Sequence, residues 1–463
     1  IALSDRITTP CHQHSAPVIP EEVERLFRHG LNFWLGSLDT LMDVEQAFAL
    51  FEQAADAGHP GAQWVMYFYA DGQAPIEQLL DWVNCAAESG DVFAQTSLGW
   101  MYEEGEGVEA DAEQAVYWYR QAAQQGYSDA QYNFGMRYEE GEGVETDAEQ
   151  AVYWYRQAAE QGHVPAKYNL GRMYGNGEGV NKDDEQAVYW YRQSAEQGYS
   201  LAQHCLGKMY AEGSKINQDD RQAMHWYIKS AEQGDAEAQY ELGTMYENGR
   251  VAEQDVEAAM YWYQRAAENG WPPAGLELAR RYEYGALCAE QDDEKALYWY
   301  RKSAEGGHEI AQSALAGKYS MGLGVEQDDM QAVYWYRKAA EQGYAEAKVQ
   351  LGGMYEEGRG VEQDFEQAVR LYREAAEQGR SAGSFRLALM YDQGLGVEQD
   401  DEQAEYWIRR ADRQHASYLY SIGRAYENGL GIHKDKGQTM RWYQQAAELG
   451  HEDAIEALKD LDG

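Results

Sequence analysis

Carboxylates gather in a series of short glycine-containing segments, and these are the residues of the chain best suited to binding a cation. One such segment, residues 103–109, reads Glu-Glu-Gly-Glu-Gly-Val-Glu. Carboxylates are calcium ligands, but the segment lacks the Asp-x-Asp-x-Asp-Gly order and the trailing glutamate of an EF-hand loop. Its Gly-x-Gly also lacks the preceding strand of a dinucleotide-binding site. We therefore interpret these segments as solvated turns and predict no metal or cofactor site in them.

A second candidate for metal chemistry lies near the start of the chain, where Cys11, His12 and His14 are close in sequence. Thiolate and imidazole groups are ligands for soft metal ions. The group stands within residues 1–20, which contain three prolines and are predicted to form a flexible extension. We therefore predict an unstructured tail there and no metal site. The other three cysteines are far apart in the sequence and predict no disulfide framework.

No local pattern in the chain points to catalysis. It contains no glycine-flanked nucleophilic serine, no HExxH sequence and no local Cys–His signature. Carboxylates are abundant, but they recur with a fixed period, as helix caps and loop residues do. A catalytic pair would depart from that period, and none stands out. We therefore predict that the protein is not an enzyme and has no catalytic residue or cofactor.

An internal sequence repeat predicts the helices that flank the recurring carboxylates. Residues 151–162 read Ala-Val-Tyr-Trp-Tyr-Arg-Gln-Ala-Ala-Glu-Gln-Gly, and related segments end at glycines spaced 36 residues apart almost throughout. A fixed period of this length is typical of a helical solenoid. The side chains predicted to share one buried face of this helix are Ala151, Trp154, Tyr155, Ala158 and Ala159. A single unit cannot bury that face alone, so the repeats must stack.

Each repeat also contains a first helix and a capped connection to the second. On the first helix, Leu170 and Met173 are predicted to be buried, and Gly171 beside them lets the partner helix come close. The second helix opens with Asp147 and, three residues later, Gln150, which is the spacing of a capping box. It ends at a glycine, which adopts the left-handed backbone conformation without steric cost. Local signals and the long period therefore agree.

Less regular segments flank the array. Residues 1–20 are predicted to be a flexible N-terminal extension, and residues 21–90 two divergent repeats. Ten more regular repeats follow at 91–450, and residues 451–463 are predicted to form a C-terminal cap with its charges facing solvent. The predicted fold is therefore an all-α solenoid of about twelve helix-turn-helix repeats with a C-terminal capping helix.

The repeat runs Ala-x-x-x-Leu-Gly-x-x-Tyr, then Gly-x-Gly-Val, then Ala-x-x-Trp-Tyr-x-x-Ala-Ala-x-x-Gly, and it resembles the Sel-1-like repeat family, a relative of tetratricopeptide repeats. The resemblance covers residues 21–463. It implies a right-handed α/α superhelix whose first helices line the concave side. Members are mostly bacterial adaptors, host-interaction factors and scaffolds, often periplasmic or secreted, so the resemblance favours such a location over the cytoplasm. Cysteine-rich members carry a disulfide in each repeat, and this chain departs from them.

The composition restricts the class of partner. The formal net charge is −42, which disfavours nucleic acid and anionic membranes, because phosphate binding needs clustered lysine and arginine. No apolar run is long enough to form a transmembrane helix, so we predict no integral membrane contact. The acidity favours solubility, a salty environment or a protein partner with a basic patch, and it does not choose among them.

Two positions on the first helices differ from repeat to repeat, and both are predicted to face away from the core. In the earlier repeats they hold aromatic and long side chains, which suits a peptide- or protein-binding surface. We name this surface the first-helix groove, and its predicted residues are Trp100, Tyr132, Met136, Tyr168, Arg172, His204, Lys208 and Tyr240. Drift at unconstrained surface positions would produce the same variation.

A second candidate surface lies on the second helices, opposite their buried face. A tyrosine recurs there, and we name the set the outer tyrosine ladder: Tyr117, Tyr153, Tyr189, Tyr261, Tyr298, Tyr334 and Tyr406. Exposed tyrosines are common anchors at interfaces. Each could instead pack on an arginine of its own array through a cation–π contact. From the sequence we favour an architectural role for the ladder and binding at the first-helix groove.

These observations predict a non-enzymatic protein-binding scaffold or adaptor. One alternative is a sequestering inhibitor such as an immunity protein, because an acidic surface would suit a basic toxin. A second alternative is a secreted factor that interacts with a host. All three bind a protein or peptide, and the sequence does not identify it.

Overall fold

The computed structural model describes residues 90–462, except 214–216, 252, 286–289, 411–414 and 429–433, together with isolated residues between 49 and 88. All regular secondary structure in the described part is α-helical. The predicted all-α fold is therefore confirmed. The Cys11–His14 group, the predicted extension and most of the two divergent repeats lie outside the described residues.

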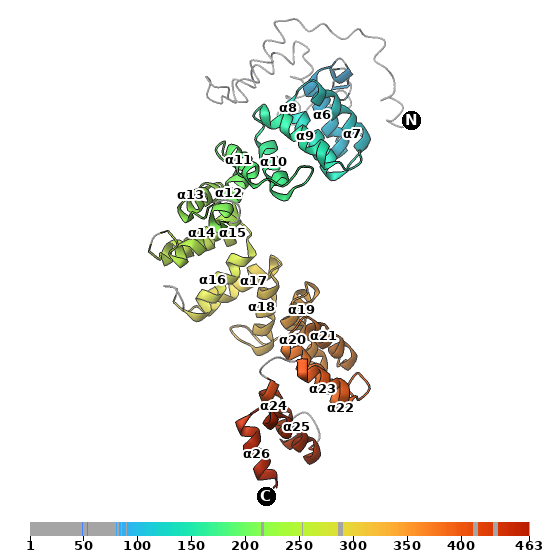
Figure 1. Ribbon diagram of the computed structural model, residues 1–463, viewed down its shortest axis with the longest axis vertical. Helices are drawn as coiled ribbons and strands as arrows, with labels where there is room; N and C mark the ends of the chain where they lie inside the picture. Colours follow the sequence, from blue (N-terminus) through green and yellow to red (C-terminus); the bar gives the residue numbers. More distant parts are fainter. Residues whose placement is uncertain are drawn as a thin grey trace. The chain divides into compact units, whose positions relative to one another are not determined.

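The chain divides into two compact units, Ile1–Gln233 and Gly234–Gly463. In the first unit the described helices follow one another in chain order (Figure 1). They are α6 (Val92–Glu104), α7 (Ala112–Gln124), α8 (Ser128–Glu140), α9 (Ala148–Glu160), α10 (Val164–Asn176), α11 (Asp184–Ala195), α12 (Ser200–Glu212) and α13 (Asp220–Glu232).

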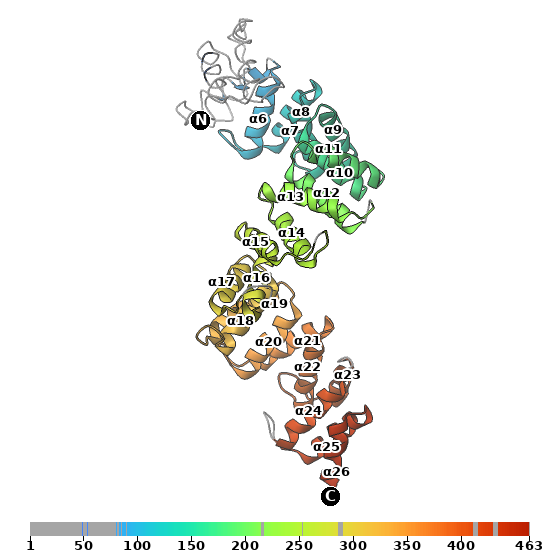
Figure 2. The same cartoon turned by 90° about the vertical axis from the view of Figure 1, so that its left-hand side faces the viewer.

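The second unit continues the same succession of helices to the C-terminal end (Figure 2). Its helices are α14 (Ala236–Asn248), α15 (Val256–Glu268), α16 (Pro272–Tyr284), α17 (Asp293–Glu305), α18 (Glu309–Met321), α19 (Asp329–Glu341), α20 (Ala345–Glu357), α21 (Phe365–Glu377), α22 (Ser381–Gln393), α23 (Asp401–Arg410), α24 (His415–Asn428), α25 (Lys436–Glu448) and α26 (Glu452–Asp462).

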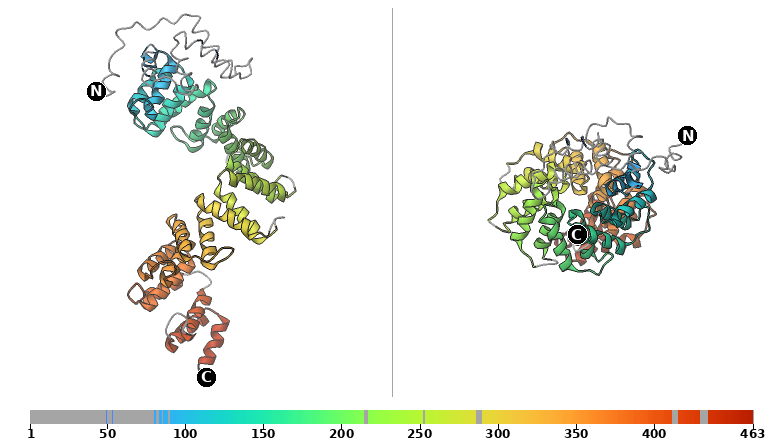
Figure 3. Two further views of the ribbon diagram at one scale, coloured as in Figure 1. Left: turned by 180° about the vertical axis from the view of Figure 1, so that it is seen from behind. Right: turned by 90° about the horizontal axis from the view of Figure 1, so that it is seen from above.

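Within each unit the helices pack as consecutive pairs, such as α8 with α9 and α20 with α21 (Figure 3). The second helix of a pair also packs against the first helix of the next pair, as α9 does against α10. This arrangement is a solenoid, because each repeat buries its apolar face against its neighbours in sequence. The predicted pairing of helices is therefore confirmed.

Helix α9 shows why these residues form helices of this length. The Asp147 side chain caps its N-terminus by accepting hydrogen bonds from the backbone N–H groups of Glu149 at 3.0 Å and Gln150 at 3.1 Å. At the other end, Gly162 has a φ of +99°, in the left-handed region that glycine adopts without strain. Both predicted end signals are therefore confirmed.

The core of each repeat follows the predicted stripe with one correction. Ala151, Tyr155, Ala158 and Ala159 are buried, but Trp154 is only half-buried. The indole lies at the edge of the helix pair, where its ring centroid is 5.2 Å from that of Phe134 on α8. The side chain that fills the centre is the tyrosine that follows the tryptophan.

A glycine on the first helix makes room for that tyrosine. A Cβ atom added at Gly171 would lie 2.7 Å from Cδ1 of Tyr191, and one at Gly135 would lie 2.9 Å from Cδ1 of Tyr155. Real Cβ atoms do not approach a ring so closely, so only glycine allows this packing. The prediction that Gly171 permits close approach of the partner helix is therefore confirmed, with the tyrosine ring as the contact.

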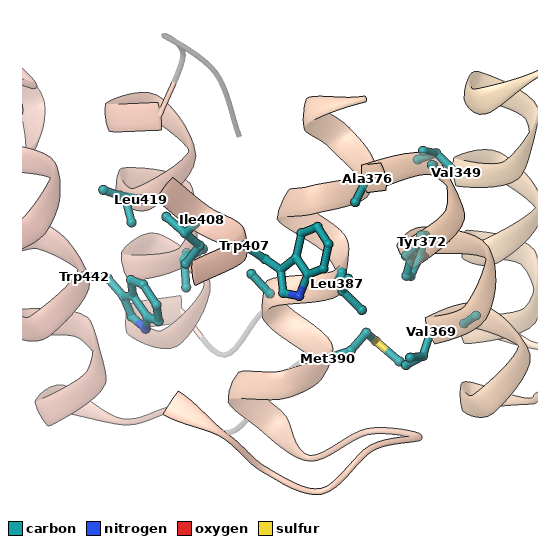
Figure 4. Packing of buried hydrophobic residues seen from close by; sticks show 14 of the residues in the cluster. Val349, Val369, Tyr372, Ala376, Leu387, Met390, Trp407, Ile408, Leu419 and Trp442 are labelled. Atoms are coloured by element: carbon teal, nitrogen blue, oxygen red, sulfur yellow. The ribbon is translucent and has the colours of Figure 1, made fainter. Parts of the chain in front are cut away.

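Several other repeats bury the tryptophan of their second helix more deeply than the Trp154 repeat does, and Trp226 and Trp299 are examples. Trp442 of α25 is fully buried, and Trp407 of α23 is nearly so, within a cluster that extends back to Val349 of α20 (Figure 4). The residues predicted to cap the array form α26, which packs against α25 and buries Ala454. Burial of this last helix face removes apolar surface that the preceding repeat would otherwise expose.

Candidate functional site

The tyrosines predicted for the first-helix groove are half-buried between repeats. The rings of Tyr132 and Tyr155 have centroids 5.7 Å apart, and Tyr132 also lies 4.6 Å from the His163 ring, which comes from the connection to the next repeat. Tyr168 and Tyr240 make the same contact with the buried tyrosine of their own repeat, at 5.7 and 5.6 Å. This position therefore faces a neighbouring repeat as well as solvent.

His204 occupies the same first-helix position as Tyr132, Tyr168 and Tyr240. For His204, the expectation that this position faces away from the core is wrong. Its side chain is buried, and its ring lies 5.9 Å from that of Tyr227. The equivalent residues Leu276 and Val349 are buried as well. The reason is geometric: stacked repeats place another helix against a side of the first helix that would face solvent in an isolated helix pair.

Arg172, also predicted for the groove, is held by carboxylates of its own chain. It forms ion pairs with Glu139 of the preceding first helix and, at 3.0 Å, with Glu178. Burial alone would lower the pKa of Arg172, but the Glu139 carboxylate raises it above its usual value. Glu139 also accepts a hydrogen bond from the Tyr155 hydroxyl at 2.8 Å. Burial and then the charge of Glu139 raise the pKa of Tyr155, so this phenol stays protonated.

The same arrangement of tyrosine, glutamate and cation recurs along both units. In each case a second-helix tyrosine donates to a glutamate of its own first helix, and the next repeat supplies a cation to that glutamate. The sets include Tyr119–Glu103–Arg137, Tyr155–Glu139–Arg172, Tyr263–Glu247–Arg281, Tyr300–Glu283–Lys318 and Tyr372–Glu356–Arg386. Partly buried, hydrogen-bonded ion pairs of this kind join successive repeats, so Arg172 has a structural role.

The remaining predicted groove residues differ in exposure. Trp100 and Met136 are half-buried and pack against hydrophobic clusters of the first unit. Lys208 is exposed. The predicted groove residues are thus engaged largely in contacts within the chain, and Lys208 is the one of the eight that is exposed.

The outer tyrosine ladder is the more accessible aromatic surface. In the first unit Tyr117, Tyr153 and Tyr189 are each about half exposed, at 49, 50 and 52%. The ring of Tyr153 stands edge-on to that of Trp154, with centroids 4.9 Å apart and planes at 82°. Tyr117 and Tyr189 make the same edge contact with the tryptophan that follows each of them, and about half of each tyrosine side chain remains exposed to solvent.

Tyr261 repeats this arrangement in the second unit. It is 52% exposed, and its ring stands edge-on to that of Trp262. The Arg265 guanidinium lies 5.9 Å from the Tyr261 ring, which is the cation–π contact considered from the sequence. The cation–π contact is therefore present at Tyr261, yet about half of the surface of this side chain remains accessible.

Sequence reasoning compared the repeats on their first helices and missed a difference on a second helix. At residues 370–371, Arg-Leu stands where the neighbouring repeats have Tyr-Trp. The signal is visible in the sequence, where Ala-Val-Arg-Leu-Tyr replaces Ala-Val-Tyr-Trp-Tyr. The structure places this pair beside a surface pocket.

The described residues contain neither a cluster of metal ligands nor a membrane-spanning helix. In that part of the chain, no group of three or more His, Cys, Asp or Glu side chains is placed to hold a metal ion. None of the helices described there is both long and apolar enough to cross a membrane.

The chain matches the family model described as Sel1 repeat in eleven segments: residues 26–59, 92–127, 128–163, 164–199, 200–235, 236–271, 272–308, 310–344, 345–379, 381–411 and 416–451. Residues 60–90, predicted to be a second divergent repeat, are not among them. The match therefore supports eleven repeats where about twelve were predicted.

Solved structures show the same relationship. The protective antigen c5321 of uropathogenic Escherichia coli, which displays an SLR fold, is 34% identical over 100% of this chain and 98% of its own, with a TM-score of 0.60. A Sel1 repeat protein from Oxalobacter formigenes is 32% identical over 68% of this chain and 91% of its own, with a TM-score of 0.58.

A more distant similarity is to the immunity protein Pa5087 of Pseudomonas aeruginosa, 24% identical over 46% of this chain and 81% of its own, with a TM-score of 0.32. No match was found among curated proteins. The repeat pattern, the stacked helix pairs and the whole-length similarity agree, and the chain belongs to the Sel1 repeat family.

Proposed function

We propose that the protein is a non-enzymatic scaffold that binds a protein partner, with its main contact on the outer tyrosine ladder of the first unit. The observation that carries the proposal is the exposure of Tyr117, Tyr153 and Tyr189, about half of each side chain, at the same position in three consecutive repeats. Tyrosine supplies a large contact area at a low entropic cost, so such a row suits an extended protein surface.

The charge of the chain supports a partner with a basic patch. A formal net charge of −42 attracts such a partner over distance and speeds its encounter with the ladder. The contacts of the first-helix groove argue for the ladder as the main surface. Arg172 is paired with Glu139 and Glu178, and His204 is buried, so neither side chain is free to receive a partner.

Variants of the two surfaces test this proposal. A partner is first isolated from the organism that encodes the protein, and its affinity is then measured by surface plasmon resonance. Serine at Tyr117, Tyr153 and Tyr189 together should weaken binding on the order of 100-fold, because interface tyrosines that anchor a contact each contribute more than about 1 kcal/mol. Circular dichroism should show unchanged helicity, since the tyrosines lie outside the core.

The matched control is Lys208→Glu, which alters the exposed member of the first-helix groove. It should leave the affinity within about twofold of the unaltered protein, apart from the small effect of one added charge. If Lys208→Glu abolishes binding and the serine variant retains it, the groove is the binding surface and the ladder is architectural. Equal affinity for all three proteins would place the contact elsewhere.

A second candidate function is a role at the interface with a host. It is supported by the similarity over the whole chain to a protein described as a protective antigen. The expected result is that cell fractionation of the encoding organism finds the protein outside the cytoplasm, in the periplasmic or secreted fraction. A wholly cytoplasmic protein would contradict this second proposal and leave the first unaffected.

A further inference from the structure

One repeat of the second unit departs from the others at the two outer positions of its second helix. On α21 these are Arg370 and Leu371, whereas α19 carries Tyr334 and Trp335 at the same positions. Leu371 is buried, but its side chain is much smaller than an indole. The substitution therefore leaves space that a tryptophan would occupy.

A surface pocket of about 350 Å³ opens at this place, between α19, α20 and α21. Its apolar lining includes Ala340, Leu351 and Leu371. Its volume is at the low end of the range for ligand pockets, so it suits a single ring rather than a large ligand.

The next repeat shows what fits such a space. There the equivalents of Ala340 and Leu351 are Ala376 and Leu387, which lie in one buried cluster with the Trp407 indole (Figure 4). The array itself therefore buries an aromatic ring within the cluster that contains this pair of side chains. In the repeat of Leu371 the same pair lines an open pocket, and an indole from another chain would meet the same apolar surface.

The charged lining of the pocket consists of Arg337, Lys348 and Arg370 against Glu341 and Glu374, so its excess of positive charge favours a negatively charged group on the ligand. Arg337 donates a hydrogen bond to the Tyr355 hydroxyl at 3.1 Å, and Lys348 pairs with Glu374 at 2.9 Å. Arg370 is exposed at the pocket and has no hydrogen bond or ion pair to any residue in the described part of the chain. Its guanidinium is thus available for a carboxylate, which it can bind through two parallel hydrogen bonds.

We propose that this pocket binds an aromatic side chain of a partner polypeptide that carries a carboxylate next to it. The ring lies against Leu351 and Leu371, and the carboxylate pairs with Arg370. The inference rests on the proposed function only in that the protein binds polypeptides, because the pocket belongs to the second unit and the ladder contact to the first.

Blocked dipeptides test the pocket directly. Binding of acetyl-Trp-Glu-amide, acetyl-Trp-Lys-amide and acetyl-Ala-Glu-amide to the full chain is measured by ligand-observed NMR. The Trp-Glu peptide should bind on the order of tenfold more tightly than the Trp-Lys peptide, because the Arg370 guanidinium attracts one and repels the other. The Ala-Glu peptide should bind at least as weakly as Trp-Lys, since it has no ring to bury.

Two variants test separately the apolar contact with the tryptophan ring of the peptide and the ion pair between its carboxylate and Arg370. Arg370→Tyr with Leu371→Trp restores the sequence of the neighbouring repeats, so it should fold normally, fill the pocket and lose Trp-Glu binding. Arg370→Glu leaves the pocket open and should reverse the preference in favour of Trp-Lys. Unchanged binding by the filled variant, or no preference between the two tryptophan peptides, would overturn the proposal. The absence of any dipeptide binding would also overturn it, while partner capture through the ladder would remain unaffected.

Discussion

Replacing Tyr155 by alanine should lower the free energy of unfolding of the first unit by about 3–5 kcal/mol, the usual cost of removing a large buried aromatic side chain. The ring is fully buried and packs against the bare backbone of Gly135. Its hydroxyl donates to Glu139 at 2.8 Å, and Glu139 in turn pairs with Arg172 of the next repeat. The substitution therefore leaves a cavity and removes a hydrogen bond from a partly buried carboxylate.

The matched control lies two residues earlier on the same helix. Tyr153→Ala removes a side chain that is half exposed, so it should cost less than about 1 kcal/mol. Urea denaturation followed by circular dichroism measures both variants. Hydrogen exchange should speed up most in α8 and α9, because each repeat of a solenoid is stabilised mainly by its neighbours. Equal losses of stability for the two variants would contradict the assignment of Tyr155 to the core.

Raising the ionic strength from about 0.01 to about 0.5 M should slow association with a basic partner by roughly tenfold or more. The chain carries a formal net charge of −42, and its field extends over about 30 Å at the lower salt concentration but only a few ångströms at the higher one. Steering acts before contact, so the rate of dissociation should change little. Stopped-flow or surface plasmon resonance kinetics across a salt series measure both rates.

The ladder variant serves as the control for this experiment. Serine at Tyr117, Tyr153 and Tyr189 leaves the net charge unchanged, so it should raise the dissociation rate and preserve the salt dependence of association. An association rate that does not respond to salt would contradict electrostatic steering. The acidity would then act only on solubility, and the partner would be recognised through the tyrosines alone.

The class of fold and the ends of the helices could be predicted from the amino-acid sequence alone. The period of 36 residues predicts stacked helix pairs because one amphipathic pair cannot bury its own apolar face. Asp147 and Gly162 mark the ends of a helix and its connection through local backbone geometry, which does not depend on distant residues. Gly171 was predicted as a point of close approach between helices because it lies beside the buried residues of its own helix, and the ring of Tyr191 occupies that place.

Which side chains remain accessible depends on the packing of one repeat against the next, and this could not be predicted from the sequence. A helical wheel gives the direction of a side chain around its own axis, but it contains no information about where the next repeat lies. His204 therefore looked solvent-facing and is buried, and Arg172 looked available and is paired with Glu139. The pocket beside Leu371 depends on three helices at once. The burial of His204, the pairing of Arg172 and this pocket all arise from packing between repeats. Stacking can therefore expose one face of a helix to solvent in one repeat and bury the equivalent face against a neighbouring helix in another.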